Sequence, residues 1–433
     1  MEPIKEYLKN FMVRNKKYHK KYSSLVLIGG NTGTSTYADN IYQQIYQLSG
    51  GKKGKVGIIT SANTPYDWDC KDNGTSTEGG CNDPRAKNSK IAANRYISRF
   101  TQHGINSEWL PIDLANTELA NDEKLAQRIL KGEFTGFFFG GGKQTDHIKT
   151  FYHNSKDSKQ ESAVLSAIRA KFSEGGLVIA GTSAGAVVQS SDTMIVAGRS
   201  NQALIEGAIE DDQPVGSNLK YLKNQGFGFF DYGIIDSHFS QRGREGRAIR
   251  LASDTGNNLI FGIDEATALV VTKANKPGAK MKVVGRNGVQ LLKLSYAKSQ
   301  INKRNLWSIK NVESSYLTDG DQYIPVKDKI IFHPKKKNLI NKERLSGEIK
   351  PSQDIFSSRR SAKNEFINTA KKLVDTKDIK TAYGYPRTKE VKYVVRFKKT
   401  NQTKAYYDEQ NGERVISYSG LKITIRPRKN RDF

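Results

Sequence analysis

The stretch GLVIAGTSAG, residues 176–185, places a continuous apolar run directly before a turn of small residues. The runs SLVLIGG (24–30), KVGIIT (55–60), SEWLPID (107–113) and GFFFGGG (136–142) end in the same way, in glycine or a small polar residue. Such runs are typical of strands that are buried on both faces of a parallel sheet. We therefore expect the chemistry of this chain at the carboxyl ends of these strands.

Longer amphipathic stretches separate the apolar runs, at residues 37–48, 88–103, 122–130 and 161–173. This alternation predicts an α/β fold with a mostly parallel sheet flanked by helices. Later apolar runs, FGFFDYGIIDSHFS, NLIFGIDEATALVV and KMKVVGRNGVQLLKL, complete this first domain near residue 297.

The character of the chain changes after residue 297. Residues 333–352 are polar and lysine-rich, as in an exposed loop. Residues 357–374 have apolar side chains at helical spacing, and the strand-like runs around Asn411-Gly412 indicate a hairpin. We predict a basic N-terminal arm (1–22), a catalytic domain (23–297) and a basic extension that forms a small α+β module (298–433).

The chain is strongly basic, with a formal net charge of +26. Residues 301–433 hold 31 lysines and arginines against 15 acidic residues. Such an excess attracts anionic polymers or surfaces. Nucleic acid is disfavoured as a partner, because no binding motif is present and few aromatic residues alternate with the basic ones.

No apolar run reaches the length of about 18 residues that a transmembrane helix needs, and the N-terminus has charges where a signal peptide is apolar. This pattern predicts a cytoplasmic protein. Cys70 and Cys81 lie close together in DWDCKDNGTSTEGGC, and a disulfide between them would instead indicate export. Two free thiols are the alternative, whereas a metal site is disfavoured because no histidine or second cysteine pair accompanies them.

Three segments carry side chains suited to nucleophilic catalysis. The sequence Gly181-Thr182-Ser183-Ala184-Gly185 fits the G-x-S-x-G nucleophile elbow after a strand. His238 follows the apolar run GII, where it could act as a general base, and Glu265 or Asp264 could orient it. Taken singly, each has a plainer interpretation: a glycine-rich turn, a structural histidine and a solvated acidic turn.

Taken together, LVLIGGN, FFFGGGKQ, VIAGTSAGA, DSHFSQRGREGR and FGIDEATAL resemble the cyanophycinases, a family of serine peptidases related to aspartyl dipeptidases. The resemblance covers about residues 23–290. It implies Ser183 as nucleophile, His238 as base and Glu265 as the third member. It further implies an oxyanion hole from Gly141 or Gly142 with Ala184, no metal or cofactor, and a homodimer.

The resemblance also implies the substrate, cyanophycin, which is a poly-aspartate backbone with arginine joined to each side chain, cut to β-Asp-Arg dipeptides. Each repeat has one carboxylate, suited to bidentate pairs with arginine, and one guanidinium, suited to an aspartate. The residues at the positions of the family's substrate contacts are Gln144, Asp236, Ser237, Gln241, Arg242, Arg244 and Arg247.

The sequence departs from the family at two such positions, where Lys143 and Ser237 replace the usual Asp and Gln. An aspartyl or isoaspartyl peptidase with another substrate therefore stays open. A second alternative is a basic polymer-binding protein built on a hydrolase-like domain.

Overall fold

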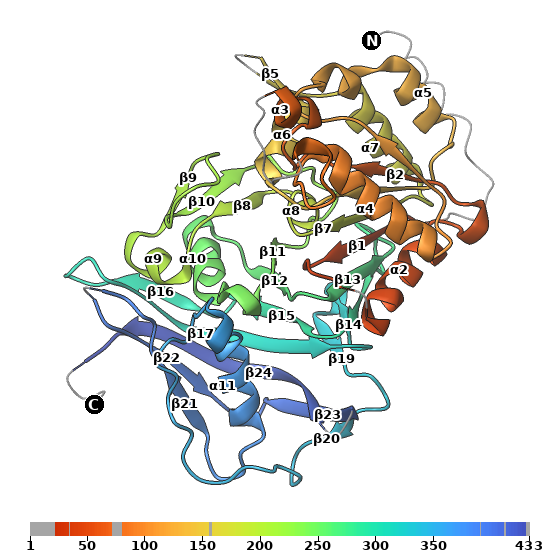
Figure 1. Cartoon of the computed structure of the whole chain (residues 1–433). Coiled ribbons are helices and arrows are strands. Elements are labelled where there is room, and N and C mark those ends of the chain that lie inside the picture. Colours follow the sequence, from red (N-terminus) through yellow and green to blue (C-terminus); the bar gives the residue numbers. More distant parts are fainter. Residues whose placement is uncertain are drawn as a thin grey trace.

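Two large β-sheets form the frame of the chain, and helices cover the first of them (Figure 1). The structure is a computed structural model that describes residues 22–33, 35–71, 80–155, 158–389, 391–410 and 413–429. Apart from Tyr22, the predicted N-terminal arm lies outside the described residues.

The first sheet has the strand order β19-β18-β14-β13-β1-β7-β4-β2-β3. Its parallel half contains the predicted strands, namely β1 (Ser24–Ile28), β7 (Val178–Thr182), β4 (Gly136–Phe139), β2 (Val56–Ile59) and β3 (Ser107–Leu110). Its other half is antiparallel, with β13 (Thr267–Thr272), β14 (Lys280–Gly285), β18 (Gln322–Ile324) and β19 (Lys329–Ile331). The predicted α/β class is confirmed, and the sheet is mixed.

Both faces of the parallel half are buried, as the continuous apolar runs require. Val26 and Ile28 point to α2 (Thr36–Leu48) and α4 (Ser89–Gln102), while Leu25 and Leu27 point to the opposite side. That opposite side is covered by α5 (Glu123–Leu130) and α7 (Ala163–Glu174). Side-chain caps fix where these helices begin: Asn88 caps α4, Asp122 caps α5 and Ser162 caps α7.

The second sheet follows the order β11-β12-β15-β17-β24-β22-β21 and crosses residue 297. Its strands are β11 (Ile234–Ser237), β12 (Leu259–Ile263), β15 (Gly288–Lys293), β17 (Trp307–Thr318), β24 (Glu413–Pro427), β22 (Tyr393–Lys398) and β21 (Thr381–Gly384). Strand β16 (Lys298–Ile301) pairs with β17, and β23 (Lys404–Gln410) forms the predicted hairpin with β24. The extension thus contains the helix α11 (Glu365–Val374) and strands that belong to a sheet shared with the preceding segment.

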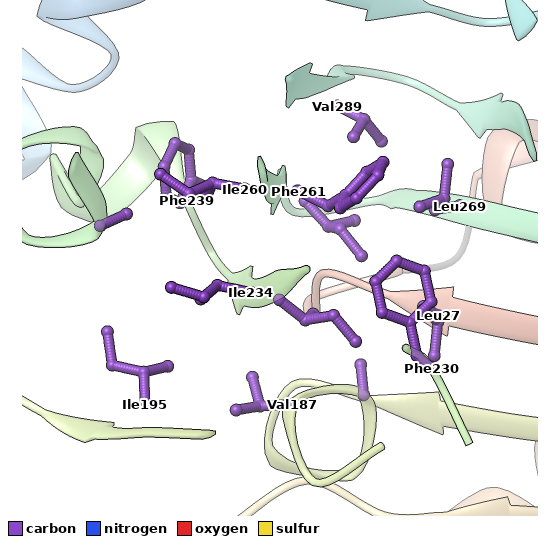
Figure 2. Packing of buried hydrophobic residues seen from close by; sticks show 14 of the residues in the cluster. Leu27, Val187, Ile195, Phe230, Ile234, Phe239, Ile260, Phe261, Leu269 and Val289 are labelled. Carbon is purple, nitrogen blue, oxygen red and sulfur yellow. The ribbon is translucent and has the colours of Figure 1, made fainter. Parts of the chain in front are cut away.

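One hydrophobic core joins the two sheets. Figure 2 shows Leu27 of β1 and Leu269 of β13 close to Ile260 and Phe261 of β12 and to Val289 of β15. The remaining helices and strands that matter below are α3 (Tyr66–Lys71), α6 (Gln144–Phe151), α8 (Ala184–Val187), β8 (Thr193–Ala197), α9 (Ser200–Glu206) and α10 (Glu245–Thr255). Among the described residues, no helix has the length and apolarity needed to cross a membrane.

Candidate active site

Ser183 lies in a sharp turn between β7 and α8, with a backbone φ of 54°. The turn needs glycine on both sides. A Cβ atom at Gly181 would come within 2.1 Å of the carbonyl oxygen of Gly185, and one at Gly185 within 2.0 Å of that of Phe139. The G-x-S-x-G motif therefore has the tight geometry expected of a nucleophile elbow.

His238 follows β11, also with a positive φ of 46°. Its Nε2 atom lies 2.9 Å from Ser183 Oγ, and its Nδ1 atom lies 2.8 Å from Glu265 Oε1. An ionised carboxylate can only accept a hydrogen bond, so Nδ1 carries the proton and Nε2 is free to accept the serine proton. The structure thus joins the three predicted residues into one chain of hydrogen bonds.

Three successive carbonyl groups at the end of β1 hold these three segments. The carbonyl oxygen of Ile28 accepts the N–H of Ser183 at 2.9 Å, that of Gly29 accepts the N–H of His238 at 2.8 Å, and that of Gly30 accepts the N–H of Ala266, next to Glu265, at 2.8 Å. The end of one strand therefore sets the relative positions of all three.

The pKa values of His238 and Glu265 suit acid–base chemistry. Burial lowers the pKa of His238, the hydrogen bond to Glu265 opposes this effect, and the charges of Arg242 and Arg244 add to the lowering. The pKa of Glu265 falls to about 2, chiefly because it accepts the hydrogen bond from His238. At neutral pH the imidazole is therefore an unprotonated base beside an ionised carboxylate.

Asp264 points away from His238. It accepts hydrogen bonds from the Ser240 N–H at 2.8 Å and from the Tyr316 hydroxyl at 2.6 Å, and burial raises its pKa. Of the two carboxylates considered from the sequence, Glu265 is thus the one that contacts the imidazole.

The expected oxyanion donors surround the serine turn. The N–H of Ala184 begins α8, and a Cβ atom at Gly141 would lie 3.3 Å from Ser183 Cβ. The N–H of Gly141 donates to the Tyr96 hydroxyl at 3.2 Å, whereas no described residue accepts the N–H of Gly142 or Ala184. The latter two are therefore the better placed donors for a developing negative charge.

Asp236, Arg244 and Arg247 form a buried ion cluster. Arg247 makes a bidentate pair with Asp236 at 2.9 and 2.7 Å, and Arg244 donates to the same carboxylate at 2.8 Å. Burial would raise the pKa of Asp236, but the two arginines outweigh it and hold that pKa below its usual value. Both arginines are thus engaged by the one carboxylate, and their contact with substrate stays a prediction.

The other predicted substrate residues differ in how accessible they are. Gln144 donates to the carbonyls of Ile195 and Val196 in β8, Gln241 accepts the N–H of Glu265, and Ser237 is buried. Arg242 is exposed on the turn after His238, and its guanidinium forms no hydrogen bond or ion pair with any described residue. It is therefore a cation available to a substrate at this site.

Several supporting residues escaped the sequence analysis. His147 accepts a hydrogen bond from Ser61 and donates to the Gly140 carbonyl at 3.0 Å, while Asn63 donates to the Gly141 carbonyl at 2.9 Å. Together they brace the glycine-rich loop. Asn31, which hydrogen-bonds Glu265, lies in the quoted segment LVLIGGN, and its position after a strand end was a usable signal.

The extension packs directly against the His238 turn. A Cβ atom at Gly243 would meet the carbonyl oxygen of Phe356 at 2.2 Å, and one at Gly246 would meet its ring at 2.8 Å. The N–H of Asn364 donates to the Ser240 carbonyl at 3.3 Å. Residues of the extension beyond residue 350 thus contact the segment that carries His238 and hold it in position.

Cys70, in α3, and Cys81 are joined by a disulfide. The segment between them includes residues 72–79, which lie outside the described residues. Within the described part of the chain, no cluster of His, Cys, Asp and Glu is suited to hold a metal ion.

No protein-family model matches the chain. It is similar to a cyanophycinase of Geminocystis herdmanii, 24% identical over 309 residues, which cover 70% of this chain and 93% of that protein. It is also similar to a cyanophycinase of Synechococcus elongatus, 24% identical over 311 residues (70% and 80%), and to one of Trichormus variabilis, 23% identical over 306 residues (69% and 84%). With its α/β fold and the joined Ser183, His238 and Glu265, the chain is thus similar to the cyanophycinases.

Proposed function

We propose that this chain is a serine peptidase that hydrolyses cyanophycin to β-Asp-Arg dipeptides through an acyl-enzyme. The observation that carries the proposal is the hydrogen-bonded chain from Ser183 Oγ through His238 to Glu265, at 2.9 and 2.8 Å. Three such groups in contact, with the serine on a strained turn, have a catalytic use and no evident structural one.

In this mechanism Ser183 Oγ attacks a backbone carbonyl at an aspartyl residue while His238 Nε2 takes the hydroxyl proton. Glu265 stabilises the imidazolium, and the N–H groups of Ala184 and Gly142 stabilise the oxyanion. His238 then gives its proton to the leaving amine. A water molecule, deprotonated by the same imidazole, releases the acyl group and regenerates Ser183. The exposed Arg242 would bind a substrate carboxylate beside the triad.

The test is release of soluble β-Asp-Arg from insoluble cyanophycin, followed by mass spectrometry. We expect Ser183→Ala to lower the rate by about 10⁴- to 10⁶-fold, because the nucleophile is lost. Ser191→Ala, a change of the same kind eight residues along the chain, should leave the rate within about twofold. Equal rates for wild type and Ser183→Ala would contradict the proposal.

A related aspartyl or isoaspartyl peptidase is the second candidate, and the exposed Lys143 favours it. Lys143 lies at the start of α6, at a position where the cyanophycinases usually have an aspartate. Its positive charge repels a guanidinium, so the site suits the arginine side chains of cyanophycin poorly. Labelling of Ser183 by a fluorophosphonate, without release of dipeptide from cyanophycin, would favour this candidate.

A further inference from the structure

The outward face of the extension sheet has a concentration of positive charge. On β22 and β24, Tyr393, Val395 and Ile425 are buried, so the alternate residues Arg396 and Arg426 lie on the other face. On β16 and β17, Lys298 lies directly opposite Lys310. Figure 1 shows these strands side by side at one end of the sheet.

A groove of about 820 Å³ runs along this face. Lys303, Arg304 and Lys310, from the β16–β17 hairpin, contribute three of its basic residues. Four more come from Lys392, just before β22, Arg426 of β24, and Arg428 and Lys429 just after β24. None of the described residues that line this basic groove is acidic or aromatic.

The charges of the hairpin are not neutralised internally. Lys303, Arg304 and Lys310 form no ion pair with any described residue, whereas Lys422 on the same sheet pairs with Glu313 at 2.9 Å. Like charges directly opposite each other on neighbouring strands are destabilising. The pair Lys298 and Lys310 therefore lowers the stability of the free protein, and a bound anion would relieve that repulsion.

We infer that the basic groove binds a linear polyanion whose repeats carry phosphate groups. Lys310 of β17 and Arg426 of β24 line the groove from the sheet, and the other cations come from the hairpin turn and from the residues beside β22 and β24. Several positive charges in one groove suit closely spaced negative charges along a polymer. The lack of acidic residues disfavours cyanophycin, whose repeats each carry a guanidinium. The lack of aromatic residues removes the platform on which bases stack, so recognition rests on the backbone charges.

The test measures the affinity of the full chain for fluorescent inorganic polyphosphate at several salt concentrations. We expect Lys303→Glu/Lys310→Glu to weaken binding by at least about tenfold and to make the salt dependence shallower. Because Lys310→Glu would create an ion pair with Lys298, this variant should unfold at no lower temperature than wild type. An unchanged unfolding temperature would show that any loss of binding does not result from a loss of structure.

Lys52→Glu/Lys53→Glu is the matched control, since it changes the net charge equally at two exposed lysines of the catalytic segment. An equal loss in the control, or no binding by wild type at low salt, would overturn the inference. Oligothymidylate at equal phosphate concentration distinguishes the two possible sources of the phosphate groups. An affinity similar to that for polyphosphate would support a nucleic-acid backbone as the ligand, and a weaker affinity would support an inorganic phosphate polymer.

Discussion

At the scale of single residues, Gly30 fixes the position of the histidine. It has a φ of +103°, and a Cβ atom there would meet His238 Cε1 at 2.3 Å and Nε2 at 2.5 Å. We expect Gly30→Ala to displace the imidazole from Ser183 and to lower kcat/KM by at least about 100-fold, as misplacement of a reacting group does. Hydrolysis of the substrate by the purified variant measures this.

Gly33→Ala is the control for that change. Gly33 has a similar backbone conformation, with φ +66°, but a Cβ atom there would meet nothing within 4 Å. It should therefore share the backbone strain while retaining most of the activity. Equal loss in both variants would show that strain, rather than the clash with His238, is responsible.

Arg242 adds to the lowering of the His238 pKa. Removing this positive charge in Arg242→Gln should raise that pKa, so the acid limb of the kcat/KM profile should move to higher pH. Because burial is the largest cause of the lowering, the limb should stay below the usual histidine value of about 6.5. Arg304→Gln, in the basic groove, should leave the limb in place; movement to lower pH in Arg242→Gln would refute the assignment.

At the scale of elements, the segment around Phe356 supports the turn that carries His238. Phe356 is 5% exposed and contacts Gly243 and Gly246. We expect Phe356→Ala to lower the free energy of unfolding by about 3–5 kcal/mol, as for other buried phenylalanines, and also to lower kcat. Urea unfolding and the rate at low temperature measure the two effects separately.

Phe134→Ala is the control that separates an effect on the position of His238 from an effect on the stability of the protein. Phe134 is also buried, at 1% exposure, but it lies before β4 and packs against Phe137. Its loss should destabilise the protein to a similar degree and leave kcat nearly unchanged below the unfolding transition. If both variants lose activity alike, the effect belongs to stability alone.

Local signals explain which elements the sequence could predict. The helices α2, α4, α5 and α7 lie within two residues of the predicted ranges, because caps and apolar spacing are local. Strand direction is different: β13 runs antiparallel to β1, and β14 runs antiparallel to β13, and these directions depend on pairing across long distances in the chain. The ion pairs of Asp236 also could not be predicted. Its motif contains both arginine partners, but the sequence does not show that they pair with it.

At the scale of the whole molecule, the second sheet crosses the predicted domain boundary. Strand β15 pairs with β17 from Gly288 to Lys293, and one core cluster includes residues on both sides of residue 297. The change in composition after that residue predicted a separate module, because composition records exposure and not pairing. We expect a single heat-capacity peak in calorimetry. If the segment on either side of residue 297 unfolded, the strands and core residues of the other segment would be exposed. Two resolved peaks would instead support an independently folding extension.

The three carbonyl groups at the end of β1 make the length of that segment as important as its residues. Ile28, Gly29 and Gly30 each hold a different part of the triad, in order. One residue inserted between Ile28 and Gly29 would move the two later acceptors by about 3.3 Å along the strand. The serine would keep its anchor while the histidine and the glutamate lost theirs. Insertions and deletions, more than substitutions, are thus the changes that this strand end cannot accommodate.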